Sequence, residues 1–295
     1  MSAKIIDGKT IAKKVCDELK SQISTLKTAP QLAVILVGDN EASQIYVRNK
    51  QKKAAEIGID CHIIELSSSI GQNALLNTID ELNANPHING IIVQLPLPEH
   101  LDKHCIINHI SPEKDVDGFT PHNNGLLSYN HPDCIISATP KGVLHLLQST
   151  DTTLKGKHAV IIGRSNIVGR PMAQLLLNHD CTVTITHAQT RNLEQITQTA
   201  DIIISACGQP KMITADWIKD DAIVIDVGIN RLDYKICGDI DFDSVKEKAS
   251  FITPVPGGVG PMTIAMLLKN TYEAYLKQQS NPSASHHCHK NCACH

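Results

Sequence analysis

A tyrosine and a lysine stand four positions apart in the segment SQIYVRNKQKKAAEIG, at Tyr46 and Lys50. Residues at this spacing share one face of a helix, so a phenol and an amine would lie side by side. Such a pair can move protons, but a lysine acts as a base near neutral pH only where burial or neighbouring positive charge lowers its pKa. The spacing also arises by chance on solvated helices. The pair is therefore a candidate for proton transfer, with an ordinary helix surface as the alternative.

A second candidate is the turn in VIIGRSNIVGRP, which has Gly163 at the end of an apolar run, Ser165 two residues later and Gly169 inside the next helix. Glycines in such a turn allow close backbone approach to a pyrophosphate, and the helix N-terminus offers unpaired N–H groups. The variant is weak evidence alone, since Gly and Ser close many strand-to-helix turns. Because further strand–helix repeats follow it, the turn favours dinucleotide binding over an empty sheet domain.

The residues after this turn favour NADP over NAD. An NAD site usually carries an acidic residue about 20 positions later, which binds the ribose 2′-hydroxyl. Residues 183–187 contain no acid, whereas Arg164 lies in the turn and Arg191 follows the second strand. Guanidinium groups suit the 2′-phosphate of NADP.

The elements that must position these residues follow from hydropathy. Continuous apolar runs alternate with helical patterns, which is typical of parallel strands covered on both faces. In the first part of the chain we expect strands at 31–38, 61–66 and 90–95, and helices at 7–26, 43–57 and 72–83. Residues 96–140 are proline-rich and suit a connection with site-forming loops. The alternation then resumes, with strands at 158–163, 182–186, 201–208 and 222–228, helices from near 140 and at 169–178, 192–199 and 214–219, and a hairpin within 230–242.

The predicted fold class is α/β, with two three-layer αβα lobes and a cleft between them. The second lobe is expected to be a Rossmann-like, doubly wound parallel sheet. The expected bounds are 1–140 plus a C-terminal helix at about 261–278 for the first lobe, 141–260 for the second, and 279–295 for a flexible His/Cys-rich tail.

Composition excludes several classes of function. The 295 residues are 42% hydrophobic and 19% charged, which is ordinary for a globular chain of two domains. A net charge of −3 and 3% aromatic residues favour neither nucleic acid nor a membrane surface as a partner. We find no signal peptide and no apolar run of about 18 residues, so we expect a soluble, cytoplasmic protein. Its scattered cysteines are expected to be reduced, namely Cys16, Cys61, Cys105, Cys134, Cys181, Cys207 and Cys237.

The chain ends in HHCHKNCACH, after a polar linker. Such a peptide could wrap a Zn²⁺ or Cu⁺ ion tetrahedrally. The spacing matches no zinc-finger class, so a tail without a dedicated ligand is the favoured interpretation and no metal is required. The speculative ligands are Cys288, His289, Cys292 and Cys294.

Five segments together resemble one family. SQIYVRNK, GIIVQLPLP, KDVDGFTP, GRSNIVGRPM and ITPVPGGVGPMT occur in the order found in bifunctional methylenetetrahydrofolate dehydrogenase/methenyltetrahydrofolate cyclohydrolases. The similarity spans residues 1–278, and VQLPLP and PVPGGVGPMT are unusual enough to make it specific. It implies oxidation of 5,10-methylenetetrahydrofolate to 5,10-methenyltetrahydrofolate with NADP, then hydrolysis to 10-formyltetrahydrofolate. It also implies a place in one-carbon metabolism and purine biosynthesis.

The resemblance implies roles for residues of the first lobe. Lys50 would transfer protons in the cyclohydrolase step, Gln94 would contact and tune it, and Tyr46 would pack on the folate. Asp117 would bond the amino-pyrimidine edge of the pterin, whose adjacent N–H donors match a carboxylate. The implied catalytic residues are Lys50, Tyr46, Gln94 and Asp117, and the implied substrate contacts are Tyr46, Gln94, Asp117, Gly260 and Thr263.

For the second lobe, the resemblance implies NADP contacts from Gly163, Arg164, Ser165 and Ile229. Relatives often carry Ser or Arg after the position of His187, where this chain has Ala188, so the 2′-phosphate would depend on Arg164 and Arg191. A homodimer through this lobe, involving the 230–242 hairpin, is also implied. No formate–tetrahydrofolate ligase domain fits in the chain, so a trifunctional enzyme is not expected.

Two alternatives remain at the sequence level. One is a monofunctional, two-lobed NAD- or NADP-dependent dehydrogenase of the amino-acid or shikimate type. The other is a nucleotide-sensing or metal-trafficking protein in which the tail is the functional part. Gln94 and Asp117, in VQLPLP and DVDG, favour a pterin ligand over the first alternative. Deletion of residues 281–295 would test the second, which predicts a loss of function.

Overall fold

The computed structural model describes residues 2–280, which divide into two compact units. The three-stranded unit comprises residues 16–125 and 267–280, and the six-stranded unit comprises residues 2–15 and 126–266. Each has a parallel sheet and helices, so the predicted α/β class is confirmed. The unit boundaries fall within the helices α1 (Gly8–Ile23), α5 (Pro121–Ser128) and α10 (Val259–Ser280).

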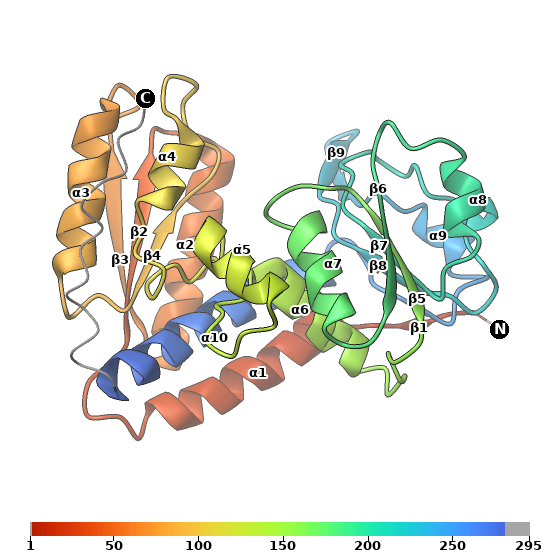
Figure 1. The fold of residues 1–295 in the computed structure, drawn as a ribbon, viewed down its shortest axis with the longest axis horizontal. Helices are drawn as coiled ribbons and strands as arrows, with labels where there is room; N and C mark the ends of the chain where they lie inside the picture. The colour runs from red at the N-terminus through yellow and green to blue at the C-terminus, as the bar shows by residue number, and fades with distance from the viewer. Residues whose placement is uncertain (1, 281–295) are drawn as a thin grey trace. The chain divides into compact units, whose positions relative to one another are not determined.

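The sheet of the three-stranded unit has the order β3-β2-β4. Its strands are β2 (Gln31–Val37), β3 (Asp60–Leu66) and β4 (Gly90–Val93), and its helices are α2 (Glu41–Ile57), α3 (Gln72–Ala84) and α4 (Lys103–Asn108), with α5 (Pro121–Ser128) at its boundary. Figure 1 shows α2 and α3 on opposite faces of this sheet. Alternate residues of β2, Ala33, Ile35 and Val37, pack with Leu75 and Ile79 of α3. Because both faces are covered, the strand reads as one apolar run.

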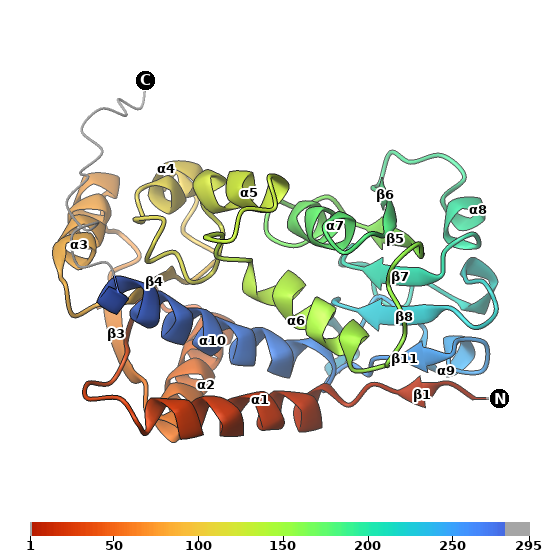
Figure 2. The same cartoon turned by 60° about the horizontal axis from the view of Figure 1, so that its bottom comes forward.

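The sheet of the six-stranded unit has the order β1-β11-β8-β7-β5-β6, which Figure 2 shows in sequence. Its strands are β1 (Lys4–Ile5), β5 (His158–Ile162), β6 (Thr182–Thr186), β7 (Ile202–Ser205), β8 (Ile223–Asp226) and β11 (Phe251–Ile252). Its helices are α6 (Ala138–Gln148), α7 (Gly169–Leu177), α8 (Leu193–Thr197), the 3₁₀ helix η1 (Ala215–Trp217) and α9 (Phe242–Val245). Figure 1 shows α7 on one face of the sheet and α8 and α9 on the other. This is the expected doubly wound arrangement.

The observed unit bounds differ from the expected ones in three places. Residues 2–15, 126–140 and 261–266 belong to the six-stranded unit, not to the first lobe. The reason at the N-terminus is β1, which pairs in parallel with β11 through Lys4 with Phe251 and Ile5 with Ile252. A strand of two residues leaves no hydropathy pattern to find.

Three smaller differences concern local structure. Residues 96–140, expected as a connection with loops, contain the short helices α4 and α5. The helix expected at 214–219 is only the three-residue η1. The hairpin is present as β9 (Asn230–Leu232) and β10 (Lys235–Cys237), and it ends before Gly238. The following residues leave it because Ile240 bridges to Ile213 instead.

Candidate active site

The predicted helix that carries Tyr46 and Lys50 is confirmed as α2. The Asn40 side chain accepts a hydrogen bond from the Ser43 N–H at 3.0 Å at its start, and Gly58, at φ +90°, ends it. Tyr46 is 42% exposed, whereas Lys50 is only 9% exposed. Lys50 is therefore buried, which argues against the alternative that this helix face is an ordinary solvated surface.

The amine of Lys50 is held by a neutral side chain. Its Nζ donates to Gln94 Oε1 at 3.0 Å, across 44 residues of sequence. Gln94 follows β4, where its N–H donates to the Ile35 carbonyl, and its own Nε2 donates to the Leu95 carbonyl at 2.7 Å. That second bond fixes the amide orientation and turns its oxygen toward Lys50. A neutral acceptor positions the amine without the charge of a carboxylate.

The segment Lys114–Asp117 is anchored by its first two side chains. Lys114 Nζ donates to the carbonyls of Leu82, Asn83 and Asn85 at 3.0, 2.7 and 2.8 Å, at the end of α3. The Asp115 carboxylate accepts from the N–H groups of Phe119 and Thr120 at 3.1 and 2.8 Å, and from the side chain of Asn123. Both residues are buried, and their side chains are bonded to the protein itself. Their role is to fix the loop that carries Asp117.

Asp117 itself is partly buried, and within residues 2–280 no group donates a hydrogen bond to its carboxylate. Burial raises its pKa from 3.8 to about 6, the positive charge of Lys50 opposes this rise, and the negative charge of Asp115 adds to it. A desolvated carboxylate without a donor is costly for the free protein. A ligand that brings adjacent N–H donors would remove that cost, so Asp117 has the properties of a binding residue.

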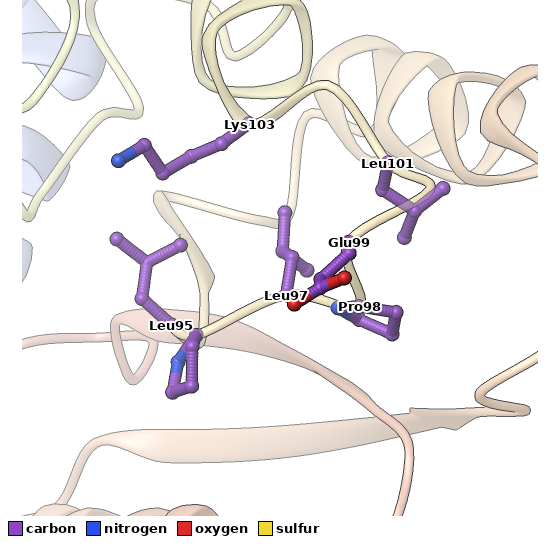
Figure 3. Close-up of a pocket in the computed structure, with 7 residues that line it drawn as sticks. Leu95, Leu97, Pro98, Glu99, Leu101 and Lys103 are labelled. Carbon is purple, nitrogen blue, oxygen red and sulfur yellow. The ribbon is translucent and has the colours of Figure 1, made fainter.

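A hollow of about 510 Å³ begins next to Gln94. It is lined by Leu95, Pro96, Leu97, Pro98, Glu99, Leu101 and Lys103. Figure 3 shows the Lys103 side chain extending from the start of α4 toward the side on which Leu95 lies. Apolar walls with a few charged groups at the edge are common in small-molecule sites. Sequence reasoning did not single out these residues, although the proline-rich VQLPLP string marked the segment.

In the six-stranded unit, the glycine turn after β5 has the close packing that a dinucleotide site needs. Gly163 has φ +127°, and a Cβ on it would overlap the Ala206 carbonyl oxygen of the loop after β7. A Cβ on Gly169 would overlap the carbonyl oxygen of Gly163. Ser165 Oγ accepts from the N–H groups of Val168 and Gly169 at 3.2 and 3.4 Å, at the start of α7. The turn therefore has the tight geometry in which backbone N–H groups reach a pyrophosphate.

The side chains around this turn offer positive charge. Arg164 and Arg191 are exposed, and within residues 2–280 neither guanidinium forms an ion pair. The loop after β6 closes through His187 and Thr190 and contains the exposed Ala188. Ile229, after β8, is 54% exposed. An apolar side chain in this position is free to contact a ligand.

The two remaining candidates lie in the six-stranded unit at the start of α10. A Cβ on Gly260 would meet nothing within 4 Å, so the residue borders open space. The Thr263 hydroxyl is 3.1 Å from that of Thr139 and donates to the Val259 carbonyl. The preceding loop is held by the Lys9 N–H, which donates to the Gly257 carbonyl at 3.1 Å.

The seven predicted reduced cysteines are free thiols. In the described part of the chain, no group of three or more His, Cys, Asp or Glu side chains could hold a metal ion. None of the described helices is both long and apolar enough to cross a membrane. The speculative tail ligands Cys288, His289, Cys292 and Cys294 lie outside the described residues.

Comparison with known proteins decides which family this geometry belongs to. The model of the tetrahydrofolate dehydrogenase/cyclohydrolase catalytic domain matches residues 6–117, and that of its NAD(P)-binding domain matches residues 137–279. The chain belongs to the tetrahydrofolate dehydrogenase/cyclohydrolase family. The resemblance predicted from five sequence segments is therefore confirmed.

Similar members of this family cover almost the whole chain. The bifunctional protein FolD of Wolbachia sp. subsp. Drosophila simulans is 53% identical over 93% of this chain and 96% of its own length. The crystal structure of FolD from Campylobacter jejuni has a TM-score of 0.93 at 48% identity, covering 94% of this chain and all of that one. The Trypanosoma brucei enzyme, solved with NADP and an inhibitor, has a TM-score of 0.91 at 38% identity, covering 95% and 99%. A shikimate dehydrogenase of Aquifex aeolicus, at 15% identity and a TM-score of 0.51, shares only the fold.

Proposed function

We propose that this protein is a bifunctional enzyme that oxidises 5,10-methylenetetrahydrofolate with NADP and hydrolyses the resulting 5,10-methenyltetrahydrofolate to 10-formyltetrahydrofolate. The observation that carries this proposal is the buried Lys50, bonded to Gln94 and close enough to Asp117 for their charges to interact. Family membership supports it, as do relatives with FolD activity in their names. The shikimate-type alternative has neither support.

The folate would bind to the three-stranded unit through complementary groups. The amino-pyrimidine edge of a pterin presents adjacent N–H donors, which match the unused acceptors of Asp117. Tyr46 is exposed one helical turn from Lys50, where its ring can pack on a flat ligand. The hollow that begins at Leu95 is apolar and suits the benzoyl part of the substrate, with Lys103 available for its carboxylates.

The cofactor would bind to the six-stranded unit, whose residues fit NADP. Gly163 and Gly169 give the close backbone packing, and Arg164 offers a guanidinium for the 2′-phosphate. Ser165 and the exposed Ile229 provide a polar and an apolar contact. When bound, NADP supplies the hydride acceptor for the dehydrogenase step. The protein groups bind and orient, and no protein side chain needs to take the hydride.

In the cyclohydrolase step, water adds to the cationic methenyl carbon, and the bond from that carbon to one nitrogen breaks. Of the two protons of the water, one is released to solvent and the other moves to that nitrogen. Lys50 Nζ is the group placed to receive and return this proton. Gln94 holds Nζ in position, and Tyr46 excludes water from one side. Asp117 anchors the pterin so that the reacting carbon stays beside Nζ.

The hairpin favours a homodimer. Leu232, Tyr234 and Ile236 are all exposed on β9, β10 and the turn between them. Three large apolar side chains on one exposed hairpin suit an interface with a second copy. Changing Leu232 and Ile236 to Asp should give monomers in light scattering, whereas an unchanged mass would exclude the hairpin from the interface.

The proposal also places the enzyme in the cytoplasm. It includes a role in purine biosynthesis, because 10-formyltetrahydrofolate is a formyl donor. The direct test is a spectrophotometric assay of the purified protein with methylenetetrahydrofolate and either NADP or NAD. We expect reduction of NADP and release of 10-formyltetrahydrofolate. If neither cofactor is reduced, the proposed activity is wrong.

A further inference from the structure

Two buried carboxylates lie side by side at the carboxyl ends of β7 and β8, which are neighbours in the middle of the six-stranded sheet (Figure 2). Asp226 is the last residue of β8 and is 4% exposed, and Asp239 follows the hairpin and is fully buried. Among the described residues, no lysine, arginine or histidine forms an ion pair with either one. Buried carboxylates need compensation, and here it comes from N–H and O–H donors.

Asp239 collects donors from two separate segments, residues 205–209 and Asn230. Its Oδ2 accepts from the Ser205 hydroxyl at 3.1 Å, the Cys207 thiol at 3.3 Å, and the N–H groups of Cys207 and Gly208 at 2.8 and 3.2 Å. Its Oδ1 accepts from the Gln209 N–H at 3.0 Å and from the Asn230 side chain at 2.8 Å. One side chain thus ties the loop after β7 to the loop after β8.

Asp226 in turn fixes Asp239. It accepts from the N–H groups of Gly228, Asp239 and Ile240 at 2.9, 3.0 and 3.0 Å. Glycine is required beside each carboxylate, because a Cβ on Gly228 would overlap Asp239 and one on Gly238 would overlap Asp226. Burial raises the pKa of Asp226 to about 7, and the negative charge of Asp239 adds to the rise. Such a costly arrangement indicates that the position of these loops matters.

One of the tied loops, the loop after β7, borders the dinucleotide turn. The Ala206 N–H donates to the Ile162 carbonyl at 2.8 Å, and the Ala206 carbonyl packs directly on Gly163. The second loop carries the exposed Ile229 between Gly228 and Asn230. In parallel sheets, ligands bind at the carboxyl ends of the strands, which is where both loops lie.

We propose that Asp239 is a positioning residue of the cofactor site, which holds the 206–209 and 228–230 loops in the conformation that binds NADP. It acts through the backbone of these loops and through Ile229. The inference rests on the proposed function, because it assumes that NADP binds to this unit.

The two activities of the enzyme allow a sharp test, because hydrolysis of methenyltetrahydrofolate does not use NADP. Asp239→Asn keeps the size of the side chain but places an NH₂ group against donors. We expect the Kd for NADP, measured by titration calorimetry, to rise roughly 10- to 100-fold, since bonds to a charged acceptor are lost. Cyclohydrolase activity should stay within about twofold of the parent, which a general loss of folding would not allow. Asp221→Asn, an exposed aspartate of the same unit, is the matched control and should change neither quantity.

A folded Asp239→Asn protein with the parental NADP Kd would overturn the inference. If Asp239→Asn does not fold, the test uses Asn230→Ala instead. This change removes one of the hydrogen-bond donors to Asp239 and leaves five in place. We then expect the NADP Kd to rise about threefold to tenfold with cyclohydrolase activity retained, and an unchanged Kd contradicts the proposal. A parent protein that binds no NADP would instead contradict the proposed function.

Discussion

The two units prepare their sites in different ways. In the three-stranded unit, side chains from distant segments meet, as Lys50 and Gln94 do across 44 residues, and Asp117 has no hydrogen-bond donor among the described residues. In the six-stranded unit, the backbone makes the site, because Gly163, Gly169 and Ala206 pack so closely that no side chain fits between them. Converging side chains suit chemistry on a small molecule that carries several different polar groups. Close backbone packing suits recognition of a phosphate chain. A variant in one unit should therefore affect one activity more than the other.

The largest effect is expected for Lys50→Met, which removes the proton-transferring amine and keeps an apolar side chain of similar length. Cyclohydrolase activity should fall by roughly 10²- to 10⁴-fold, the usual contribution of general acid–base catalysis. Dehydrogenase activity should remain measurable, because hydride transfer does not use the amine. Both rates are read from the absorbance of methenyltetrahydrofolate and NADPH. Parental hydrolysis by the variant would exclude this role for Lys50.

Gly163→Ala should lower the dehydrogenase activity and leave most of the cyclohydrolase activity. The new Cβ would overlap the Ala206 carbonyl and would sit at φ +127°, so the turn must open at a cost of about 1–3 kcal/mol. We expect kcat/KM for NADP to fall roughly 10- to 100-fold, with a much smaller change in hydrolysis. Gly156→Ala is the matched control, because Gly156 also has positive φ, at +77°, but its Cβ would meet nothing within 4 Å. If kcat/KM for NADP falls equally in both variants, the effect comes from backbone strain alone.

Asp117 should make folate binding depend on pH. Its pKa in the free protein is raised to about 6, and donors on the pterin favour the charged form. Affinity is then full above about pH 6 and weakens as the pH falls through it, up to about tenfold per unit. The stability of the free protein depends on pH in the opposite direction. Because the pKa of the Asp117 carboxyl is raised, the contribution of this group to stability is lost as the pH rises through about 6. KM for methylenetetrahydrofolate, measured between about pH 5 and 8, should lose this dependence in Asp117→Asn. A pH dependence that survives in the variant belongs to another group.

The smallest effect is expected for Arg164→Ser. An exposed charge contact contributes up to about 1 kcal/mol, so the preference for NADP over NAD should fall about fivefold. Arg191→Ser is the parallel variant, and the ratio of kcat/KM for the two cofactors is the measurement. If neither change alters the ratio, the 2′-phosphate is recognised by other groups.

The cofactor turn could be predicted from the sequence because its signals are local. Gly163, Ser165 and Gly169 lie within seven residues, between a strand and a helix that hydropathy identifies. The Lys50–Gln94 contact could not be predicted from a local signal. The spacing of Tyr46 and Lys50 indicated only that they share a helix, and the family resemblance suggested Gln94 as the partner of Lys50. Long-range pairing depends on the register of β2 with β4, which no local pattern encodes.

Other features lacked even that support. Asp239 takes its donors from Ser205, residues 207–209 and Asn230, so the sequence shows only an aspartate after a glycine. In KDVDG the residue types alone do not separate Asp115 from Asp117, and it was the family resemblance that singled out Asp117. The structure shows the physical difference, because Lys114 and Asp115 are bonded to the protein itself, whereas the Asp117 carboxylate accepts no hydrogen bond from the described residues. The signal that could have helped is the pairing of small and acidic residues, as at Gly228 and Gly238.

The strand β1 also bears on how this chain is made. Its partner β11 lies 247 residues later, since Lys4 pairs with Phe251, and the three-stranded unit likewise needs the end of α10. During synthesis β1 must therefore wait for β11, which is made much later, before it can pair. Neither unit can be completed until β11 and α10 have been translated, so the two units depend on the same late segment of the chain.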